Sequence, residues 1–327
     1  MPSARIIGTG SYVPARVLTN ADLEKLVDTS DEWIVTRTGI SERHIASDDE
    51  ATSDLAYQAA KAALESAGVD AGDLDMILVA TATPDMFFPS TACILQDRLG
   101  ARRAGGLDVS AACSGFIYGL AVANGLIRAG TVRTVLLLGA ETLTKVVNWQ
   151  DRNTCVLFGD GAGAIVLRAD EGERGVLSVH LYADGSKGPL LILPGGGSRH
   201  PVSQAVLDAG LTKIQMNSGN EVFKLAVRAM EDAALTALKQ NGYDVADVDF
   251  IITHQANMRL ISALAQRLGL PDHKVVANLK RVGNTSAASI PLALDEAVRD
   301  GRVQAGNLVL LCAFGGGLTW ASSLIRW

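Results

Sequence analysis

Apolar residues along the chain follow two periods that alternate in a regular order. Short apolar runs, such as Val135 to Gly139 and Leu308 to Ala313, are typical of buried strands. The segment from Phe116 to Ala129 instead has the spacing of an amphipathic helix, and Gly130 follows it as a stop signal. Because strands and long helices alternate in this way, the pattern predicts an α/β protein with mainly parallel sheets covered by helices.

The same order of elements occurs twice. The segment Gly-Val-Asp-Ala-Gly-Asp-Leu-Asp-Met-Ile at 68–77 is matched 174 residues later by Gly-Tyr-Asp-Val-Ala-Asp-Val-Asp-Phe-Ile at 242–251. An alanine-rich segment of helical period precedes each copy, and an apolar strand follows it. Chance recurrence of ordinary turn sequences is the alternative, but both order and spacing are kept.

Shorter matches continue downstream and support a duplication. Arg-Leu-Gly occurs at 98–100 and 267–269, and Phe-Gly-x-Gly occurs at 158–161 and 314–317. Two related halves, 1–175 and 176–327, explain these matches. The stretch 184–220, rich in glycine and proline, has no counterpart, so we expect an inserted loop with some helix.

Composition and charge narrow the class of protein. The chain has 327 residues, of which 48% are hydrophobic and 20% charged, and its formal net charge is −6. These values indicate a packed globular protein and argue against nucleic acid or an anionic membrane surface as a partner. No apolar run reaches the roughly 18 residues of a membrane span, and the N-terminus lacks a leader-like apolar stretch. We therefore expect a cytoplasmic protein.

Cys113 stands apart among the four cysteines. Since no C-x-x-C pair and no zinc-like spacing occurs, we expect neither a disulfide framework nor a metal site. Cys113 lies in the predicted turn between a strand at 107–109 and the helix that begins near Phe116. Unpaired N–H groups and the dipole at a helix N-terminus favour a thiolate, so a lowered thiol pKa is predicted there. Cys93, Cys155 and Cys312 are predicted to be ordinary small apolar residues.

The repeat suggests partners for this thiol. The spacing between the helix stops Gly130 and Gly301 makes Asn284 the counterpart of Cys113, and the strand spacing places His254 directly after a strand. Strand ends of parallel sheets present ligand groups, and two-fold related halves bring these ends together. We therefore expect Cys113, His254 and Asn284 in one site. The alternatives are a buried structural histidine for His254 and a turn or helix cap for Asn284.

Each residue type has a chemical role in such a site. A thiolate can attack an acyl carbon, and the N–H groups of histidine and asparagine can stabilise a negatively charged oxygen. The loop 314–317, Phe-Gly-Gly-Gly, offers unhindered backbone N–H groups that could complete an oxyanion hole. A plain tight turn is an equally good interpretation of these glycines.

Over essentially its full length the chain resembles the β-ketoacyl-acyl-carrier-protein synthase III family, the initiating condensing enzymes of type II fatty-acid synthesis in the thiolase superfamily. The resemblance rests on segments 28–40, 111–116, 158–164, 254–257, 283–289 and 314–317. It implies an α/β thiolase-like fold in which two duplicated βαβαβαββ halves form a five-layered αβαβα sandwich. It also implies a homodimer.

The resemblance implies a two-stage acyl transfer. Cys113 would take a short acyl group, expected to be acetyl, from acyl-CoA, while the N–H groups of Cys113 and Gly316 form the oxyanion hole. His254 and Asn284 would stabilise the enolate that forms when malonyl-acyl carrier protein loses carbon dioxide. Attack of this carbanion on the acyl-cysteine gives 3-ketoacyl-acyl carrier protein. Acyl-CoA is then a substrate, and no permanently bound cofactor or metal is implied.

Binding residues are implied by the same resemblance. An adenine ring is expected between Trp33 and Arg152, where an aromatic ring and a guanidinium can stack on its two faces. The implied coenzyme A contacts are Thr29, Trp33, Arg37, Arg152, Phe223 and Asn257. Phe88 is expected to cap the acyl pocket of the partner subunit, which suggests a short primer.

Docking of the acidic carrier protein is assigned to Lys224 and Arg259, because a net-acidic enzyme needs a local basic patch for an acidic partner. Gln266 departs from the family pattern, in which a further lysine is common at this position. Arg228 and Arg267 are the residues expected to compensate.

Other functions remain open from the sequence. A related Cys/His/Asn enzyme could load a specialised primer in secondary metabolism. Degradative thiolases use a second cysteine, elongating condensing enzymes use two histidines, and chalcone-synthase-type enzymes are usually longer, so these and HMG-CoA synthase fit less well. A papain-like Cys/His/Asn hydrolase is disfavoured because the C-G-[SA]-C-[WY] signature is absent. An inactive carrier-binding homologue is disfavoured by the intact Cys/His/Asn set.

Overall fold

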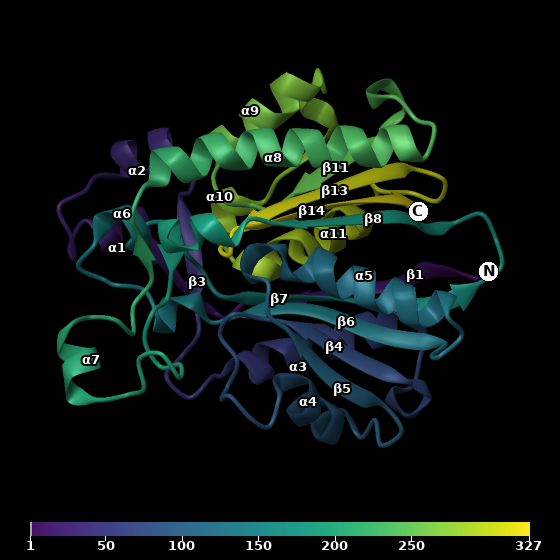
Figure 1. Cartoon of the computed structure of the whole chain (residues 1–327), viewed down its shortest axis with the longest axis horizontal. Helices are drawn as coiled ribbons and strands as arrows, with labels where there is room; N and C mark the ends of the chain where they lie inside the picture. The colour runs from purple at the N-terminus through teal and green to yellow at the C-terminus, as the bar shows by residue number, and fades with distance from the viewer. Residues whose placement is uncertain (1) are drawn as a thin grey trace.

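The computed structural model describes residues 2–327 and stacks two five-stranded sheets (Figure 1). The first sheet has the order β1-β7-β6-β4-β5, with β1 Ser3–Tyr12, β4 Met76–Ala80, β5 Gly105–Val109, β6 Thr134–Glu141 and β7 Gly161–Asp170. The second sheet has the order β12-β11-β13-β14-β8, with β8 Gly175–Ala183, β11 Phe250–Thr253, β12 Val275–Val276, β13 Leu308–Gly315 and β14 Thr319–Arg326. Read from β8 to β12, the second sheet matches the first strand by strand, as a duplication predicts.

Helices complete five layers (Figure 1). The middle layer holds α5 (Gly115–Arg128) and α11 (Ser289–Arg299), whose apolar faces share one core with both sheets. The first sheet is covered outside by α3 (Thr52–Ala67) and α4 (Thr91–Leu99), and the second by α8 (Gly219–Gln240) and α9 (Met258–Leu268). The predicted βαβαβαββ order is thus present in each sheet, whereas the boundary at 175/176 stays a prediction.

The sheets are mixed, which corrects the expectation of mainly parallel sheets. In the first sheet β6, β4 and β5 are parallel, but β7 pairs antiparallel with both β6 and β1. The second sheet repeats this arrangement with β13, β14 and β8. Only residues 316–318 join β13 to β14, a connection far too short for the crossover that parallel strands require.

Close contact between the layers brings the strand ends of the first sheet next to the turn that starts α11. A Cβ on Gly139 of β6 would lie 2.1 Å from the carbonyl oxygen of Ala287. Only glycine allows this approach. The turn Ser286–Ala288 therefore rests directly against β6, close to the ends of β4 and β5.

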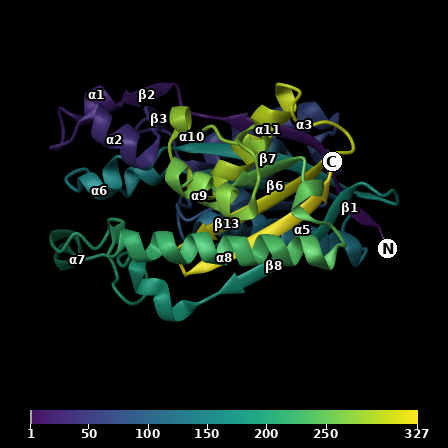
Figure 2. The ribbon, with the colours of Figure 1, turned by 90° about the horizontal axis from the view of Figure 1, so that it is seen from above.

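Shorter elements gather at one end of the molecule (Figures 1 and 2). They include β2 Arg16–Thr19, α1 Asn20–Leu23, α2 Asp31–Thr38, β3 Glu42–Ile45, α6 Arg152–Cys155 and α10 Leu279–Val282. The predicted insertion is present there and contains some helix, with β9 Leu191–Ile192, α7 Gln204–Asp208 and β10 Gln215–Met216. In residues 2–327, no helix combines the length and apolar character that crossing a bilayer needs.

Candidate active site

One cavity of about 510 Å³ brings the three predicted catalytic residues together. Cys113, His254 and Asn284 all line it, and they are only 8%, 3% and 6% exposed. Its lining also includes residues at the surface, among them Arg37 and Arg259. The cavity therefore connects the exterior to a buried thiol, imidazole and carboxamide.

Cys113 lies at the strand-to-helix turn that the sequence predicts. It is the middle residue of a single 3-10 turn, Ala112–Ser114, between β5 and α5. Gly315 at the end of β13 packs against this turn so closely that a Cβ there would lie 2.7 Å from the Cys113 nitrogen. Glycine at 315 thus lets the second sheet approach Cys113. Gly316, the predicted oxyanion donor, follows directly but is not among the lining residues.

The predicted lowering of the thiol pKa is wrong for this structure. Burial raises the pKa of Cys113 to about 12, and the nearby Glu141 carboxylate adds to the increase. Hydrogen bonding to Ser286 and to a backbone N–H opposes the shift but does not cancel it. Loss of solvation therefore outweighs the helix N-terminus, and Cys113 is a thiol at neutral pH.

This pKa gives a direct prediction for Cys113. Because the pKa is raised, the thiolate fraction should grow about tenfold per pH unit from pH 6 to 10. Alkylation of Cys113 by iodoacetamide, followed by peptide mass spectrometry, should rise with that slope. The Cys93→Ser variant serves as background, because it removes the exposed cysteine. A rate that is already constant above pH 6 would show a lowered pKa and contradict the expectation.

The side-chain amide of Asn284 has a fixed orientation. Its Oδ1 accepts the Ser286 N–H at 2.9 Å, so Nδ2 is left to donate into the cavity. The Asn284 backbone is bound to the N-terminal half of the chain. Its N–H donates to the Leu157 carbonyl (2.8 Å), and its carbonyl accepts from the Gly159 N–H (3.0 Å). The Phe-Gly-x-Gly segment singled out in the sequence thus anchors Asn284.

His254 continues the line of β11, with its backbone N–H donating to the Cys312 carbonyl of β13 at 2.8 Å. Its Nδ1 lies 2.8 Å from the Ser289 hydroxyl, which in turn lies 2.7 Å from the Ser286 carbonyl. Burial lowers the pKa of His254 to about 4, so the ring is neutral at pH 7. The Ser289 hydroxyl can donate its one proton either to His254 Nδ1 or to the Ser286 carbonyl. If it donates to Nδ1, the ring hydrogen of His254 is on Nε2; if it donates to the carbonyl, the ring hydrogen is on Nδ1.

The predicted equivalence of Cys113 and Asn284 needs a correction. The structure pairs the turn Ala112–Ser114 with Ser286–Ala288, so the counterpart of Cys113 is Ala287. The expectation used the helix ends, but α11 has 11 residues and α5 has 14. Asn284 reaches the site from just before the turn. Ala112 and Ser286 also share a left-handed backbone, with φ of 44° and 48°, the only such non-glycine residues in 2–327.

Several predicted coenzyme A contacts lie at the cavity entrance. Trp33, Arg37, Phe223 and Asn257 line it, and Asn257 also caps α9 by accepting the Leu260 N–H at 2.8 Å. Thr29 and Arg152 are not among the lining residues.

Arg152 and Arg37 both lie on the Trp33 ring, with their guanidinium carbons 5.2 and 4.8 Å from its centroid. A base between Trp33 and Arg152 would need about 3.5–4 Å on each face. Arg152, which also donates to the Asp28 carbonyl at 2.8 Å, would therefore have to move outward.

The predicted docking residues differ in their surroundings. Lys224 is exposed, and the Arg259 guanidinium carbon lies 6.0 Å from the Phe223 ring at the cavity entrance. Arg267, expected to compensate for Gln266, is paired with Glu231. Arg228 is exposed, so it is the better candidate for this compensation.

Three polar residues around the site, Ser286, Ser289 and Glu141, were not predicted from the sequence to have a role. Ser286 and Ser289 orient Asn284 and His254, as described above. Glu141 is fully buried at the end of β6, where it accepts the Ala82 N–H (3.1 Å) and the Thr83 hydroxyl (2.6 Å), and burial raises its pKa. In residues 2–327, no three His, Cys, Asp or Glu side chains form a group able to hold a metal ion.

Comparisons with known proteins agree with this geometry. Two family models match: 3-oxoacyl-[acyl-carrier-protein] synthase III over 107–185, and its C-terminal model over 238–327. A curated relative from Xanthomonas euvesicatoria, β-ketoacyl-[acyl-carrier-protein] synthase III, is 58% identical, and the match covers 99% of this chain and 98% of the relative.

Solved structures give the same result. The 3-oxoacyl-[acyl-carrier-protein] synthase III of Aquifex aeolicus has 49% identity and a TM-score of 0.92, covering 99% of this chain and all of the other. A priming β-ketosynthase from a polyketide biosynthetic pathway has 37% identity and a TM-score of 0.92, covering 99% and 96%. The thiolase-like fold is thus confirmed, and the hydrolase alternative has no support.

A buried thiol, imidazole and carboxamide on a duplicated scaffold, together with full-length identity above one half to a curated relative, place the chain in one family. It belongs to the β-ketoacyl-acyl-carrier-protein synthase III family of acyltransferases.

Proposed function

We propose that this enzyme condenses a short acyl-CoA with malonyl-acyl carrier protein, giving 3-ketoacyl-acyl carrier protein and carbon dioxide and so initiating fatty-acid synthesis. The observation that carries the proposal is the shared cavity, which joins Cys113 to two hydrogen-bond donors and opens to the surface. Acyl transfer needs a nucleophile, and decarboxylation needs stabilised negative charge on an oxygen. Both are present in one chamber.

In the first stage, the Cys113 sulfur attacks the thioester carbon of acyl-CoA after losing its proton. The Cys113–acyl bond forms, the bond to the coenzyme A sulfur breaks, and the released coenzyme A thiolate takes up the proton that Cys113 lost, so the step needs no net proton. The backbone N–H groups of Cys113 and Gly316 are proposed to bind the oxyanion, and the closeness of 315–316 to the Ala112–Ser114 turn supports this.

In the second stage, the bond between the malonyl carboxylate and its α-carbon breaks, and its electrons pass to the thioester as an enolate. Asn284 Nδ2 and His254 Nε2 are proposed to donate hydrogen bonds to the enolate oxygen. Asn284 suits this because its Oδ1 is already occupied by Ser286. The carbanion then forms a carbon–carbon bond to the acyl group and releases Cys113.

The role of His254 requires its proton on Nε2. The ring is neutral, and Nδ1 faces Ser289, whose hydroxyl donates to the Ser286 carbonyl. Nε2 carries hydrogen when this hydroxyl turns and donates its proton to Nδ1 instead. A neutral imidazole also avoids a cation that would hold the malonyl carboxylate and oppose its loss. Lowering of the His254 pKa by burial therefore suits decarboxylation across the neutral range.

Coenzyme A and the carrier protein are proposed to bind at different residues around the cavity entrance. Coenzyme A is proposed to bind with Thr29, Trp33, Arg37, Arg152, Phe223 and Asn257. Lys224 and Arg259 are proposed to dock the carrier protein, with Arg228 as an additional cation. Arg259 stands beside Phe223 at the cavity entrance, where a carrier-bound pantetheine arm would enter.

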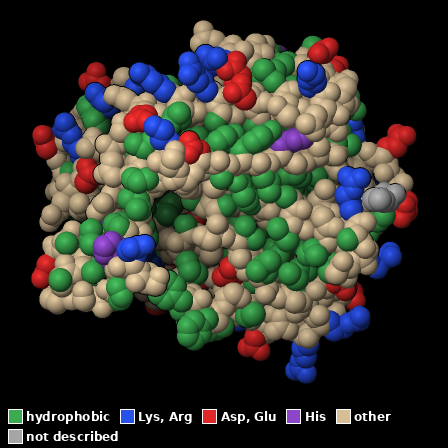
Figure 3. All heavy atoms as spheres, in the orientation of Figure 1, with side chains coloured by type: hydrophobic (Ala, Val, Ile, Leu, Met, Phe, Trp, Pro, Cys, Tyr) green, Lys and Arg blue, Asp and Glu red, His purple; other side chains and the backbone are tan. Residues whose placement is uncertain are grey.

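We further propose a homodimer formed through an apolar face. Figure 3 shows this face over α5, in the region between β8 and β5 of Figure 1. Leu181 on β8 and Leu107 on β5 are 40% and 43% exposed, and both strands are sheet edges. Phe87 and Phe88, in the loop before α4, are 78% and 85% exposed. Such large exposed apolar groups mark a protein interface.

Removing the proposed cap gives a prediction on chain length. Phe88→Ala should increase loading of acyl chains longer than acetyl by about tenfold or more, because the partner's pocket gains room for added methylenes. Intact-protein mass spectrometry with a series of acyl-CoAs measures this. Phe87→Ala is the matched control. An unchanged chain-length profile in Phe88→Ala would argue against the capping role.

The experiment that tests the proposed function is intact-protein mass spectrometry after mixing with a panel of acyl-CoAs. The mass increment identifies the primer, peptide mapping identifies the acylated residue, and carbon dioxide release from malonyl-acyl carrier protein tests the second stage. Preference for an unusual primer would favour the second candidate, a priming enzyme of secondary metabolism. The similarity to a priming β-ketosynthase from a polyketide pathway supports this second candidate.

A further inference from the structure

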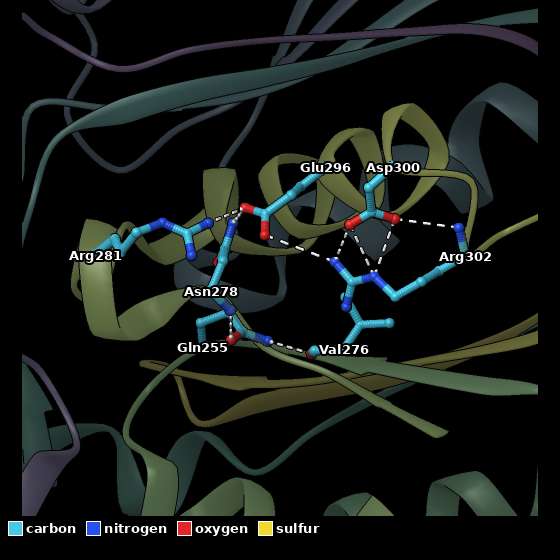
Figure 4. Close-up of polar contacts among 7 residues, drawn as sticks. All are labelled: Gln255, Val276, Asn278, Arg281, Glu296, Asp300 and Arg302. Carbon is cyan, nitrogen blue, oxygen red and sulfur yellow. Dashed lines mark hydrogen bonds and ion pairs between the residues drawn. The ribbon is translucent and has the colours of Figure 1, made fainter. Parts of the chain in front are cut away.

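The residue that follows His254 stays outside the cavity but links two segments of the site. Gln255 is completely buried and is not among the lining residues. Its Nε2 donates to the Thr253 carbonyl at 2.8 Å. Its Nε2 also donates to the Val276 carbonyl (3.3 Å), and its Oε1 accepts the Asn278 N–H (3.2 Å) (Figure 4). These bonds join the end of β11 to the segment that follows β12.

That segment leads directly to Asn284. Asn278 is the residue before α10, a helix of only four residues, and Gly283 separates this helix from Asn284. Only α10 and Gly283 therefore lie between Asn278 and Asn284. Gln255 therefore connects the backbone of His254 to the backbone that carries Asn284.

Charged side chains support the outer side of this connection (Figure 4). Asn278 Nδ2 donates to Glu296 at 3.4 Å, and Arg281 of α10 donates to the same oxygen at 2.7 Å. Glu296 belongs to α11, so the pair ties α10 to the middle layer. Arg302 lies 3.6 Å from the other Glu296 oxygen and is itself paired with Asp300 at 2.6 Å. Asn278 Oδ1 is buried and has no partner in residues 2–327.

We propose that Gln255 is a positioning residue that fixes His254 relative to Asn284, with Asn278 and Glu296 as its outer support. This deepens the proposed function and rests on it, because the two donors must meet at one enolate oxygen. A misplacement of about 1 Å can cost about 10²-fold in rate. Cys113 is held by other elements, namely β5, α5 and the Gly315 contact, so acyl loading should not depend on Gln255.

The test compares the two stages in the Gln255→Met variant, which keeps the length of the side chain and removes its three hydrogen bonds. Carbon dioxide release from malonyl-CoA should fall about 10²-fold in kcat with KM nearly unchanged. Acylation of Cys113 by acetyl-CoA, followed by intact mass, should change less than about threefold. Gln96→Met is the matched control, because Gln96 Nε2 also donates to a backbone carbonyl, that of Ala101 at 2.8 Å, and it should leave both rates unchanged.

Equal losses in both stages, or no loss in either, would overturn the inference, since a purely structural residue would not separate them. If Gln255→Met does not fold, Asn278→Ala decides, because it keeps the backbone bond to Gln255 and removes the link to Glu296. A selective fall of about tenfold in carbon dioxide release supports the inference, and an equal change or none opposes it. A wild-type protein that neither acylates Cys113 nor decarboxylates malonyl-CoA would instead disprove the proposed function, so the two failures are distinct.

Discussion

Replacing Cys113 by serine is expected to reduce acyl loading from acyl-CoA by about 10⁴-fold or more, because the variant loses the proposed nucleophile of the first stage. The hydroxyl of serine is far less acidic than a thiol, and the same burial that raises the thiol pKa would disfavour an alkoxide further. The measurement is the acyl mass increment on the intact protein as a function of time. Decarboxylation of malonyl-acyl carrier protein should persist at a slow rate, because other residues, His254 and Asn284, are proposed to stabilise that charge.

The controls for this variant separate loss of chemistry from loss of fold. Cys93→Ser changes the same atom at an exposed cysteine and should leave loading unchanged. Thermal unfolding should show that Cys113→Ser remains folded, since the substitution is nearly isosteric. Acylation of Cys113→Ser at the wild-type rate would refute the assignment of the nucleophile.

Much of the architecture could be predicted because duplication leaves a periodic record in the sequence. The matching segments at 68–77 and 242–251 correspond to the approaches to β4 and β11, which hold equivalent positions in the two sheets. Strand direction could not be predicted in the same way. The apolar pattern of β7 and β14 marks them as buried strands but does not show whether each strand runs parallel or antiparallel to its neighbour.

The site was predictable as a set of residues but not as an arrangement. Cys113, His254 and Asn284 follow from strand ends and turns, yet the alignment of Cys113 with Asn284 failed because α11 is shorter than α5. The sign of the thiol pKa shift also could not be predicted. A helix N-terminus is visible in the sequence, whereas the burial that outweighs it depends on Gly315 and other contacts from distant segments.

Replacing Asn284 by alanine is expected to lower carbon dioxide release from malonyl-acyl carrier protein by about 10²- to 10³-fold, the usual cost of losing one oxyanion donor. Acyl loading of Cys113 should change much less, because that oxyanion is proposed to be bound by backbone N–H groups. Since Asn284 is held by backbone bonds to Leu157 and Gly159, the alanine variant keeps its main-chain position and loses only the amide. Asn307→Ala is the control, because the Asn307 side chain likewise accepts a backbone N–H, from Gln304 at 2.7 Å, in a turn outside the cavity lining. Equal losses in loading and decarboxylation for Asn284→Ala would mean that the amide acts in both stages, or only on the fold, and would count against its role at the enolate.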